Sequence, residues 1–137
     1  MIELATPVTT NFVADNLADD EIGVIEFGRD NAGELCYECA SQSVMSWAVI
    51  VDGEPVCLFG ADGQSGDEWA SAWMFSTPNV QKARFEVIKG ARKAVEFSRD
   101  FWPELRIRAE DRTEKQIKFL KVIGFKPSED DPTELIL

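Results

Sequence analysis

The stretch VMSWAVIVDGEPVCLFG, residues 44–60, decides the fold. Residues 44–51 form an apolar run with several β-branched side chains, and residues 55–59 form a second, shorter run. Asp52 and Gly53 separate the two runs, and Asp-Gly is typical of the two-residue turn of a β-hairpin. We therefore expect these residues to form two antiparallel strands.

The residues that follow predict a third strand and then a long helix. Residues 60–66 are rich in Gly and Asp and indicate a loop, whereas EWASAWMFS, residues 68–76, is typical of a strand that completes a meander. Thr77 and Pro78 form a helix-start signature, because Thr caps free N–H groups and Pro is tolerated at the first helical position. Apolar residues then recur at helical spacing as far as Arg99, which predicts one continuous helix.

Shorter patterns predict the remaining elements. Strands are expected at residues 2–5 and 105–109, and in a hairpin of Phe125 with residues 133–137 around an acidic turn at 128–132. Helices are expected at residues 7–17 after Thr6, at 34–42 after Asp30, and at 114–122 between the cap Thr113 and the terminator Gly124. Residues 22–27 fit either a strand or a short helix, and the acidic residues 19–21 indicate a solvated connection. The result is one α+β domain over residues 1–137, in the order β-α-α-β-β-β-α-β-α-β-β.

The charge of the chain is unevenly distributed. The 137 residues include 25 acidic and 14 basic side chains, which gives a net charge of -11. Residues 1–81 contain a single basic side chain, Arg29, whereas residues 82–126 carry an excess of Lys and Arg. We therefore expect no direct nucleic-acid partner, but the second half of the chain retains the charge for a local anion site.

The chain contains no histidine and three cysteines. Without histidine, Ser-His-Asp and Cys-His catalysis and histidine-ligated metals are excluded. Cys36, Cys39 and Cys57 are too few for a disulfide framework or for a four-ligand zinc site built from Cys and His, so we expect no metal and a reducing compartment. Cys36 and Cys39 fit either a redox pair or two small buried side chains on one helix face, and the second interpretation is favoured.

Membrane and secretion signals are missing from the sequence. No run of 18 apolar residues occurs, and the first ten residues, MIELATPVTT, lack the basic and apolar regions of a signal peptide. We therefore expect a soluble protein that works inside a cell, with no membrane partner.

Four segments together resemble the GNAT superfamily of N-acetyltransferases. They are the hairpin at residues 44–60, EWASAWMFST running into a capped helix, ELRIRAED, and TEKQIKFLKVIGF with its terminal Gly124-Phe125. The resemblance is strongest over residues 44–125 and implies a mixed, mainly antiparallel sheet flanked by helices. WMFST, the basic helix and KFLKVIG are in addition similar to GNAT-like internal virion and assembly proteins of short-tailed bacteriophages, which implies a location in the host cytoplasm or in the virion.

The resemblance implies acetyl-CoA as cofactor, but the expected binding loop is altered. Active members hold the pyrophosphate on backbone N–H groups of a Gln/Arg-x-x-Gly-x-Gly/Ala loop at a helix start. The matching residues begin with Gln81 but have Arg84 and Glu86 at the glycine positions, where bulk hinders close backbone approach. Lys82 and Arg84 remain as side-chain phosphate ligands. The cofactor contacts that the resemblance implies are Met74, Phe75 and Ser76 on the pantetheine arm, Gln81, Lys82 and Arg84 at the pyrophosphate, and Thr113.

The catalytic positions also depart from the family pattern. Acetyl transfer to an amine needs a base for the amine proton and, usually, a hydroxyl acid near the departing thiolate. Leu120 stands where family members commonly have a Tyr, and it cannot donate a proton. Glu68, or Asp67 beside it, is the candidate base by position, with a solvated carboxylate at a strand end as the alternative.

Three hypotheses for the function follow. The first is a phage-type GNAT-like protein with a degenerate acetyl-CoA site, which acts through contacts with a phage or host protein in virion assembly or host takeover. The second is an active acetyl-CoA-dependent N-acetyltransferase. The third is an acidic DNA mimic that inhibits a host protein, which the charge of -11 would suit.

Overall fold

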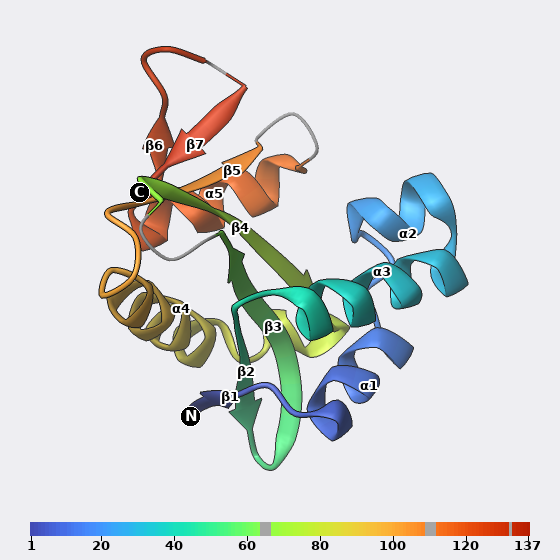
Figure 1. Cartoon of the computed structure of the whole chain (residues 1–137). Helices are drawn as coiled ribbons and strands as arrows, with labels where there is room; N and C mark the ends of the chain where they lie inside the picture. The colour runs from blue at the N-terminus through green and yellow to red at the C-terminus, as the bar shows by residue number, and fades with distance from the viewer. Residues whose placement is uncertain (64–66, 109–111, 132) are drawn as a thin grey trace.

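One mixed sheet of seven strands forms the centre of the computed structural model, which describes residues 1–63, 67–108, 112–131 and 133–137 (Figure 1). The strands lie in the order β1-β2-β3-β4-β5-β7-β6, and among them only β4 and β5 pair in parallel within the described residues. Their bounds are β1 Ile2–Leu4, β2 Met45–Val51, β3 Glu54–Asp62, β4 Trp69–Ser76, β5 Glu104–Arg108, β6 Lys126–Pro127 and β7 Glu134–Ile136. The predicted α+β class is confirmed.

Helices cover both faces of this sheet (Figure 1). On one face, Val87 of α4 packs in a core with Trp47 and Val49 of β2, and α5 lies beside α4. On the other face, Val13 of α1 packs in a core with Ala48 of β2. Successive residues of β2 thus point to opposite helical layers, as the pleat of a strand requires. The helices are α1 Pro7–Asp15, α2 Ile22–Phe27, α3 Arg29–Gln42, the short 3₁₀ helix η1 Pro78–Gln81, α4 Arg84–Ser98 and α5 Glu114–Ile123.

The central hairpin has the predicted turn. Asp52 and Gly53 both have positive φ, 52° and 77°, and Val51 pairs with Glu54 across the turn. Two consecutive positive φ values define the type I′ turn, whose twist matches that of the flanking strands. β3 continues to Asp62, beyond the predicted end at residue 59.

Two predicted helix starts are also confirmed. The Thr6 side chain accepts a hydrogen bond from the Thr9 backbone N–H, and the Thr9 side chain accepts one from Thr6, so both free donors are satisfied. Thr113 and Gln116 form the same reciprocal arrangement at the start of α5. Gly124 ends α5 with a φ of 126°, a conformation that favours glycine.

The predicted order had two helices before the hairpin and left residues 22–27 open as a strand or a short helix, and the structure has three helices there. Residues 22–27 form the separate helix α2, and α3 begins at Arg29 instead of near residue 34. Gly28, with a φ of 84°, reverses the chain between α2 and α3. Asp30 therefore lies in the first turn of α3 and does not cap it.

The prediction of one continuous helix after Thr77 was also wrong. The chain forms η1, passes through Ala83 with a φ of -106°, and begins α4 at Arg84. The Thr77 hydroxyl donates to the Val56 carbonyl at 2.9 Å instead of accepting from the helix. Because this hydroxyl links β4 to β3, it leaves the turn after β4 without the predicted cap.

Some predicted features include residues outside the described ranges. These are the loop at 60–66, the end of the strand at 105–109 and the turn at 128–132. Among the described helices, none combines the length and apolar character needed to cross a bilayer.

Candidate functional site

The sheet opens between its two parallel strands. β4 and β5 pair over only three positions, from Trp69 with Glu104 to Ser71 with Arg106. β4 then continues to Ser76 and β5 to Arg108 without pairing further with each other, so the two strands diverge in a V (Figure 1). The divergence leaves one backbone edge of β4 without a neighbouring strand in the middle of the sheet.

A small apolar cavity lies at this divergence. Its volume is about 40 Å³, room for about one water molecule. Leu120 of α5 lines the cavity and is 5 % exposed, so the position that family members commonly fill with Tyr carries no proton donor here. Other lining side chains come from β3, β4, α4 and β5, among them Phe59, Met74, Ala94 and Ile107.

The edge of β4 beyond Ser71 has a defined register. The Thr77 N–H donates to the Val56 carbonyl at 2.9 Å, which makes these two residues a hydrogen-bonded pair of the antiparallel ladder. Because such pairs alternate along the ladder, the N–H and C=O groups of Met74 and Ser76 point away from β3, toward the gap. Those of Phe75 point toward β3.

The backbone groups of Ser76 are already bonded within the protein. The Ser76 carbonyl accepts a hydrogen bond from the Ala18 N–H at 2.9 Å, and the Ser76 N–H donates to Glu21 Oε1 at 2.6 Å. Ala18 and Glu21 belong to the connection between α1 and α2, residues 16–21, which we call the α1–α2 connection. This connection therefore takes the place of a neighbouring strand along the end of β4.

Glu21 is a buried carboxyl group. It is only 4 % exposed, and burial raises its pKa from 4.5 to about 7. The hydrogen bond from Ser76 and the charge of Arg112 oppose this rise, whereas the charge of Asp20 adds to it. The prediction that residues 19–21 are a solvated connection was therefore wrong for Glu21. Its burial depends on contacts with β4, fifty-five positions later in the chain, which no local pattern reveals.

The start of α4 has a different character. The N–H groups of Lys82 and Ala83 both bond to the Asn79 carbonyl, at 3.1 and 3.2 Å, and so are consumed by η1. Arg84 and Phe85 open the first turn of α4 as exposed residues, with Phe85 80 % exposed. The side chains of Gln81, Lys82 and Glu86 are exposed as well.

Comparison with known proteins addresses the fold. No protein-family model and no curated protein matches the chain. Several solved structures match nearly all of it. An aminoglycoside 6'-acetyltransferase of type Ii is 16 % identical with a TM-score of 0.65, over 99 % of this chain and 94 % of that one. A GNAT family acetyltransferase from Brucella melitensis, in complex with acetyl-CoA, is 14 % identical with a TM-score of 0.67. The match covers 100 % of this chain and 86 % of that one. The protein PH1933 from Pyrococcus horikoshii OT3 is 13 % identical with a TM-score of 0.71, and the match covers 99 % of this chain and 94 % of that one.

The chain has the GNAT fold. A second aminoglycoside acetyltransferase among the similar structures is in complex with coenzyme A. The amide groups and phosphates of coenzyme A need free backbone donors and acceptors at fixed positions in the protein. Ser76 presents none while Ala18 and Glu21 are bound to it, and η1 consumes the N–H groups of Lys82 and Ala83. In this conformation the backbone groups of Ser76 and the N–H groups of Lys82 and Ala83 are therefore occupied by bonds within the protein.

The other predicted contacts are spread over the GNAT fold. Glu68 precedes β4 and is exposed, at the opposite end of that strand from Ser76. The Thr113 side chain accepts from the Gln116 N–H at 3.2 Å and so serves as a helix cap. Phe75 is 8 % exposed and packs in the core on the α1 and α3 side. Of the predicted contacts on β4, Met74 is the one whose backbone groups still face the gap.

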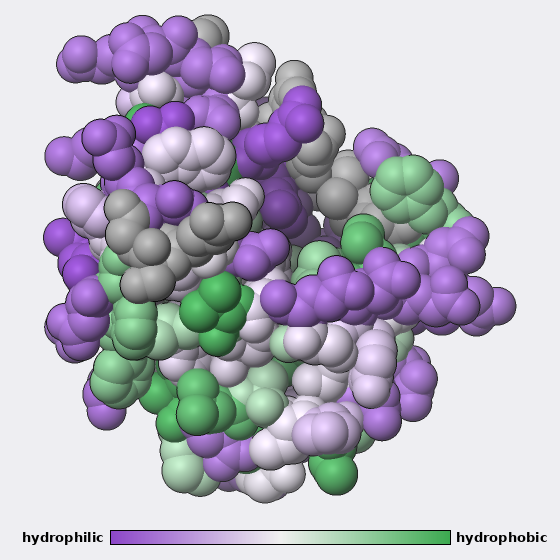
Figure 2. Space-filling view, in the orientation of Figure 1, coloured by the Kyte–Doolittle hydropathy of each residue, from purple (hydrophilic) through white to green (hydrophobic). Residues whose placement is uncertain are grey.

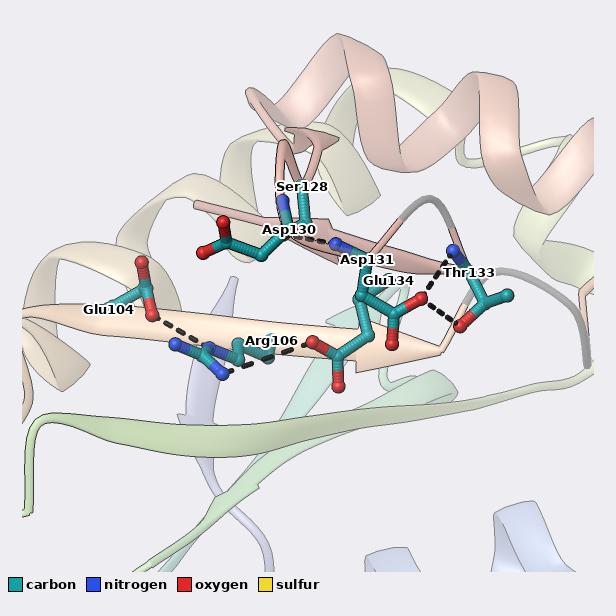
Figure 3. A network of polar contacts seen from close by, with 7 residues as sticks. All are labelled: Glu104, Arg106, Ser128, Asp130, Asp131, Thr133 and Glu134. Atoms are coloured by element: carbon teal, nitrogen blue, oxygen red, sulfur yellow. Dashed lines mark hydrogen bonds and ion pairs between the residues drawn. The ribbon is translucent and has the colours of Figure 1, made fainter.

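A polar network lies beside the start of β4 (Figure 3). Arg106 of β5 donates to Glu104 at 2.7 Å and lies 3.9 Å from Glu134. Its guanidinium also stacks over the Trp69 ring, 4.6 Å from the centroid. The charge of Arg106 is therefore matched locally by Glu104 and Glu134.

Cys36 and Cys39 belong to α3, whereas Cys57 of β3 packs in the core on the α4 face of the sheet. Cys36 and Cys57 are buried, and burial raises the pKa of Cys36 to about 12 and that of Cys57 further still. Cys39 is half-buried, and burial raises its pKa too. Such thiols are protonated and unreactive at neutral pH, which supports the interpretation as small buried side chains. The described residues contain no cluster of metal-ligating side chains.

Proposed function

We propose that this protein keeps the GNAT fold without acetyl-CoA chemistry and acts through contacts with a protein partner. The observation that carries the proposal is the edge of β4. There, the N–H and C=O groups of Ser76 face the gap between the parallel strands and are bonded to Glu21 and Ala18. A pantetheine arm that paired with this edge would have to break both bonds.

Two further positions support the same proposal. Leu120 at the cavity has no hydroxyl group to protonate a departing thiolate. Arg84 and Glu86 stand in the first turn of α4, where the resemblance places glycines, and Glu86 adds a negative charge where phosphates would lie. The altered residues therefore affect the pantetheine, thiol and pyrophosphate contacts alike.

Contacts with a protein partner are supported by large apolar side chains on the surface. Ile25 and Phe27 of α2 are 62 % and 56 % exposed, and Phe85 at the start of α4 is 80 % exposed. Figure 2 shows hydrophobic side chains over α2 among polar neighbours. Exposed apolar side chains of this size are typical of interaction surfaces when they gather in patches. A role in virion assembly or host takeover, with a phage or host protein as partner, rests on the resemblance of WMFST and KFLKVIG to phage proteins.

Calorimetric titration with acetyl-CoA and with coenzyme A tests the proposal. We expect no binding to the wild-type protein at millimolar cofactor, with an active GNAT enzyme as positive control. Micromolar binding that Lys82→Ala and Arg84→Ala both abolish would overturn the proposal, because it would show a working pyrophosphate site.

One observation favours a second candidate, an acetyl-CoA-dependent N-acetyltransferase. The pKa of Glu21, about 7, lies in the range that suits a general base at neutral pH. In this candidate Glu21 joins Glu68 as a possible base, and Gln81, Lys82 and Arg84 bind the pyrophosphate. Release of free coenzyme A thiol in the presence of a panel of primary amines would support it, provided that Glu21→Gln or Glu68→Gln removes the activity.

A further inference from the structure

The α1–α2 connection is held against β4 by a short set of polar contacts. Ala18 and Glu21 bond to the two backbone groups of Ser76, at 2.9 and 2.6 Å. The Glu21 N–H also bonds to the Ala18 carbonyl at 3.1 Å, so both partners of Ser76 lie in one turn. Arg29 at the start of α3 supports this turn from outside, since it donates to the Leu17 carbonyl at 2.6 Å.

The contact from Glu21 depends on a group that can change its charge. Neutral Glu21 accepts the Ser76 N–H without placing a negative charge in the interior. Ionised Glu21 places a negative charge where it is only 4 % exposed. A buried anion is costly unless a positive charge compensates it fully.

The groups around Glu21 compensate the anion only in part. Arg112, before α5, attracts it, whereas Asp20 of the same connection repels it. The neighbouring thiols of Cys36 on α3 and Cys57 on β3 carry no positive charge. The balance favours the neutral carboxyl group in the closed position, as the raised pKa of about 7 indicates.

We propose that the α1–α2 connection is a latch on β4, closed while Glu21 is neutral and released when Glu21 ionises into water. Release frees the Ser76 N–H and C=O toward the gap between β4 and β5. The latch rests on the proposed function in one respect, because both take the β4 edge to be closed to a ligand. The latch explains how that edge is held closed. It also predicts the condition under which that edge opens.

The size of the effect follows from proton linkage. In the open position Glu21 titrates at its ordinary pKa of 4.5, and in the closed position at about 7. The ratio of open to closed molecules therefore rises tenfold for each pH unit between these values and is constant outside them. The total change is roughly 300-fold, because the two pKa values differ by about 2.5 units.

Amide hydrogen exchange at Ser76 tests the latch. Exchange is measured between pH 4.5 and 8 and divided by the intrinsic rate at each pH. We expect protection of the Ser76 amide to fall by up to about 300-fold as the pH rises to about 7 and then to level off. Glu21→Gln, which accepts the same bond but cannot ionise, is expected to keep the amide protected at every pH. Asp20→Asn, a matched change at the exposed neighbouring acid, is expected to keep the pH dependence.

Two results would overturn the latch. One is equal Ser76 protection at pH 5 and pH 8 in the wild-type protein. The other is the same pH dependence in Glu21→Gln, because Glu21 would then not be the controlling group. Neither result depends on acetyl-CoA, so calorimetric titration of the wild-type protein tests the proposed function separately. Acetyl-CoA binding together with a working latch would overturn only the proposed function.

Discussion

The two regions in which the resemblance to GNAT enzymes places cofactor contacts differ in character. At the edge of β4, the backbone of Ser76 is buried and bonded to the distant α1–α2 connection. At the start of α4, the side chains of Lys82, Arg84 and Phe85 are exposed. The first region is closed by non-covalent contacts, which loss of the Glu21 proton or one substitution is expected to remove. The second is changed in its own side chains, which no conformational change can restore to glycine.

The largest effect on the buried region is expected from a larger side chain on β3, the strand next to β4. At Gly60 of β3, a Cβ atom would lie 2.0 Å from the Trp73 ring, whose indole N–H donates to Ser43 at 2.8 Å. We expect Gly60→Ala to lower the free energy of unfolding by roughly 3 kcal/mol, because the half-buried indole ring must move to make room for the methyl group. Urea denaturation measures this change.

A double-mutant cycle provides the control for Gly60. Trp73→Phe removes the ring atoms nearest to the added methyl group. Gly60→Ala combined with Trp73→Phe should therefore be less destabilised than the sum of the single variants. Strict additivity would show that the clash with Trp73 is not the cause.

The second way is to change the pH. Because the folded protein holds the Glu21 proton up to about pH 7 and the unfolded chain releases it near 4.5, the folded state binds more protons between these values. Glu21 therefore stabilises the fold most at low pH, and its contribution declines by up to about 3 kcal/mol as the pH rises from 4.5 to 7. The measurement is the difference in unfolding free energy between wild type and Glu21→Gln across this range. A constant difference would contradict the raised pKa of Glu21.

The third prediction concerns Thr113, which the structure uses as the N-terminal cap of α5 and the resemblance implies as a cofactor contact. Thr113→Ala removes the acceptor for the Gln116 N–H and should lower the unfolding free energy by about 1 kcal/mol. Thr113→Ser keeps the hydroxyl and should keep most of the stability. Equal stability of Thr113→Ala and wild type in thermal unfolding would show that the cap is dispensable.

The smallest effects are expected in the exposed region. Lys82 and Arg84 are exposed, and surface substitutions of this kind usually change stability by less than about 0.5 kcal/mol. Lys82→Ala and Arg84→Ala should therefore unfold at nearly the wild-type urea concentration. A loss of more than about 1 kcal/mol would contradict the contrast with the buried region.

The sequence predicted those features that depend on neighbouring residues. The hairpin turn at Asp52 and Gly53 and the caps at Thr6 and Thr113 each rest on conformational preferences or hydrogen bonds within a few positions. The resemblance added the GNAT fold, whose parallel pairing of β4 and β5 leaves no local signal.

The features that the sequence missed depend on distant contacts. Thr77 does not start the long helix, because its hydroxyl bonds to Val56, twenty-one positions earlier. Glu21 is buried because the α1–α2 connection crosses the end of β4. Neither contact can be inferred before the strands are placed side by side, so the part of the candidate site around Ser76 emerged only from the structure.

The length of the unpaired strand edges affects how readily the protein can aggregate. Within the described part of the chain, the sheet ends on one side in β1, of three residues, and on the other in β6, of two residues that include Pro127. Such short edges give another chain little backbone to pair with. The longer unpaired edge, that of β4, lies inside the sheet and is covered at Ser76 by the α1–α2 connection. The same contacts that close this edge to a ligand thus also protect the protein from strand-to-strand assembly with its own copies.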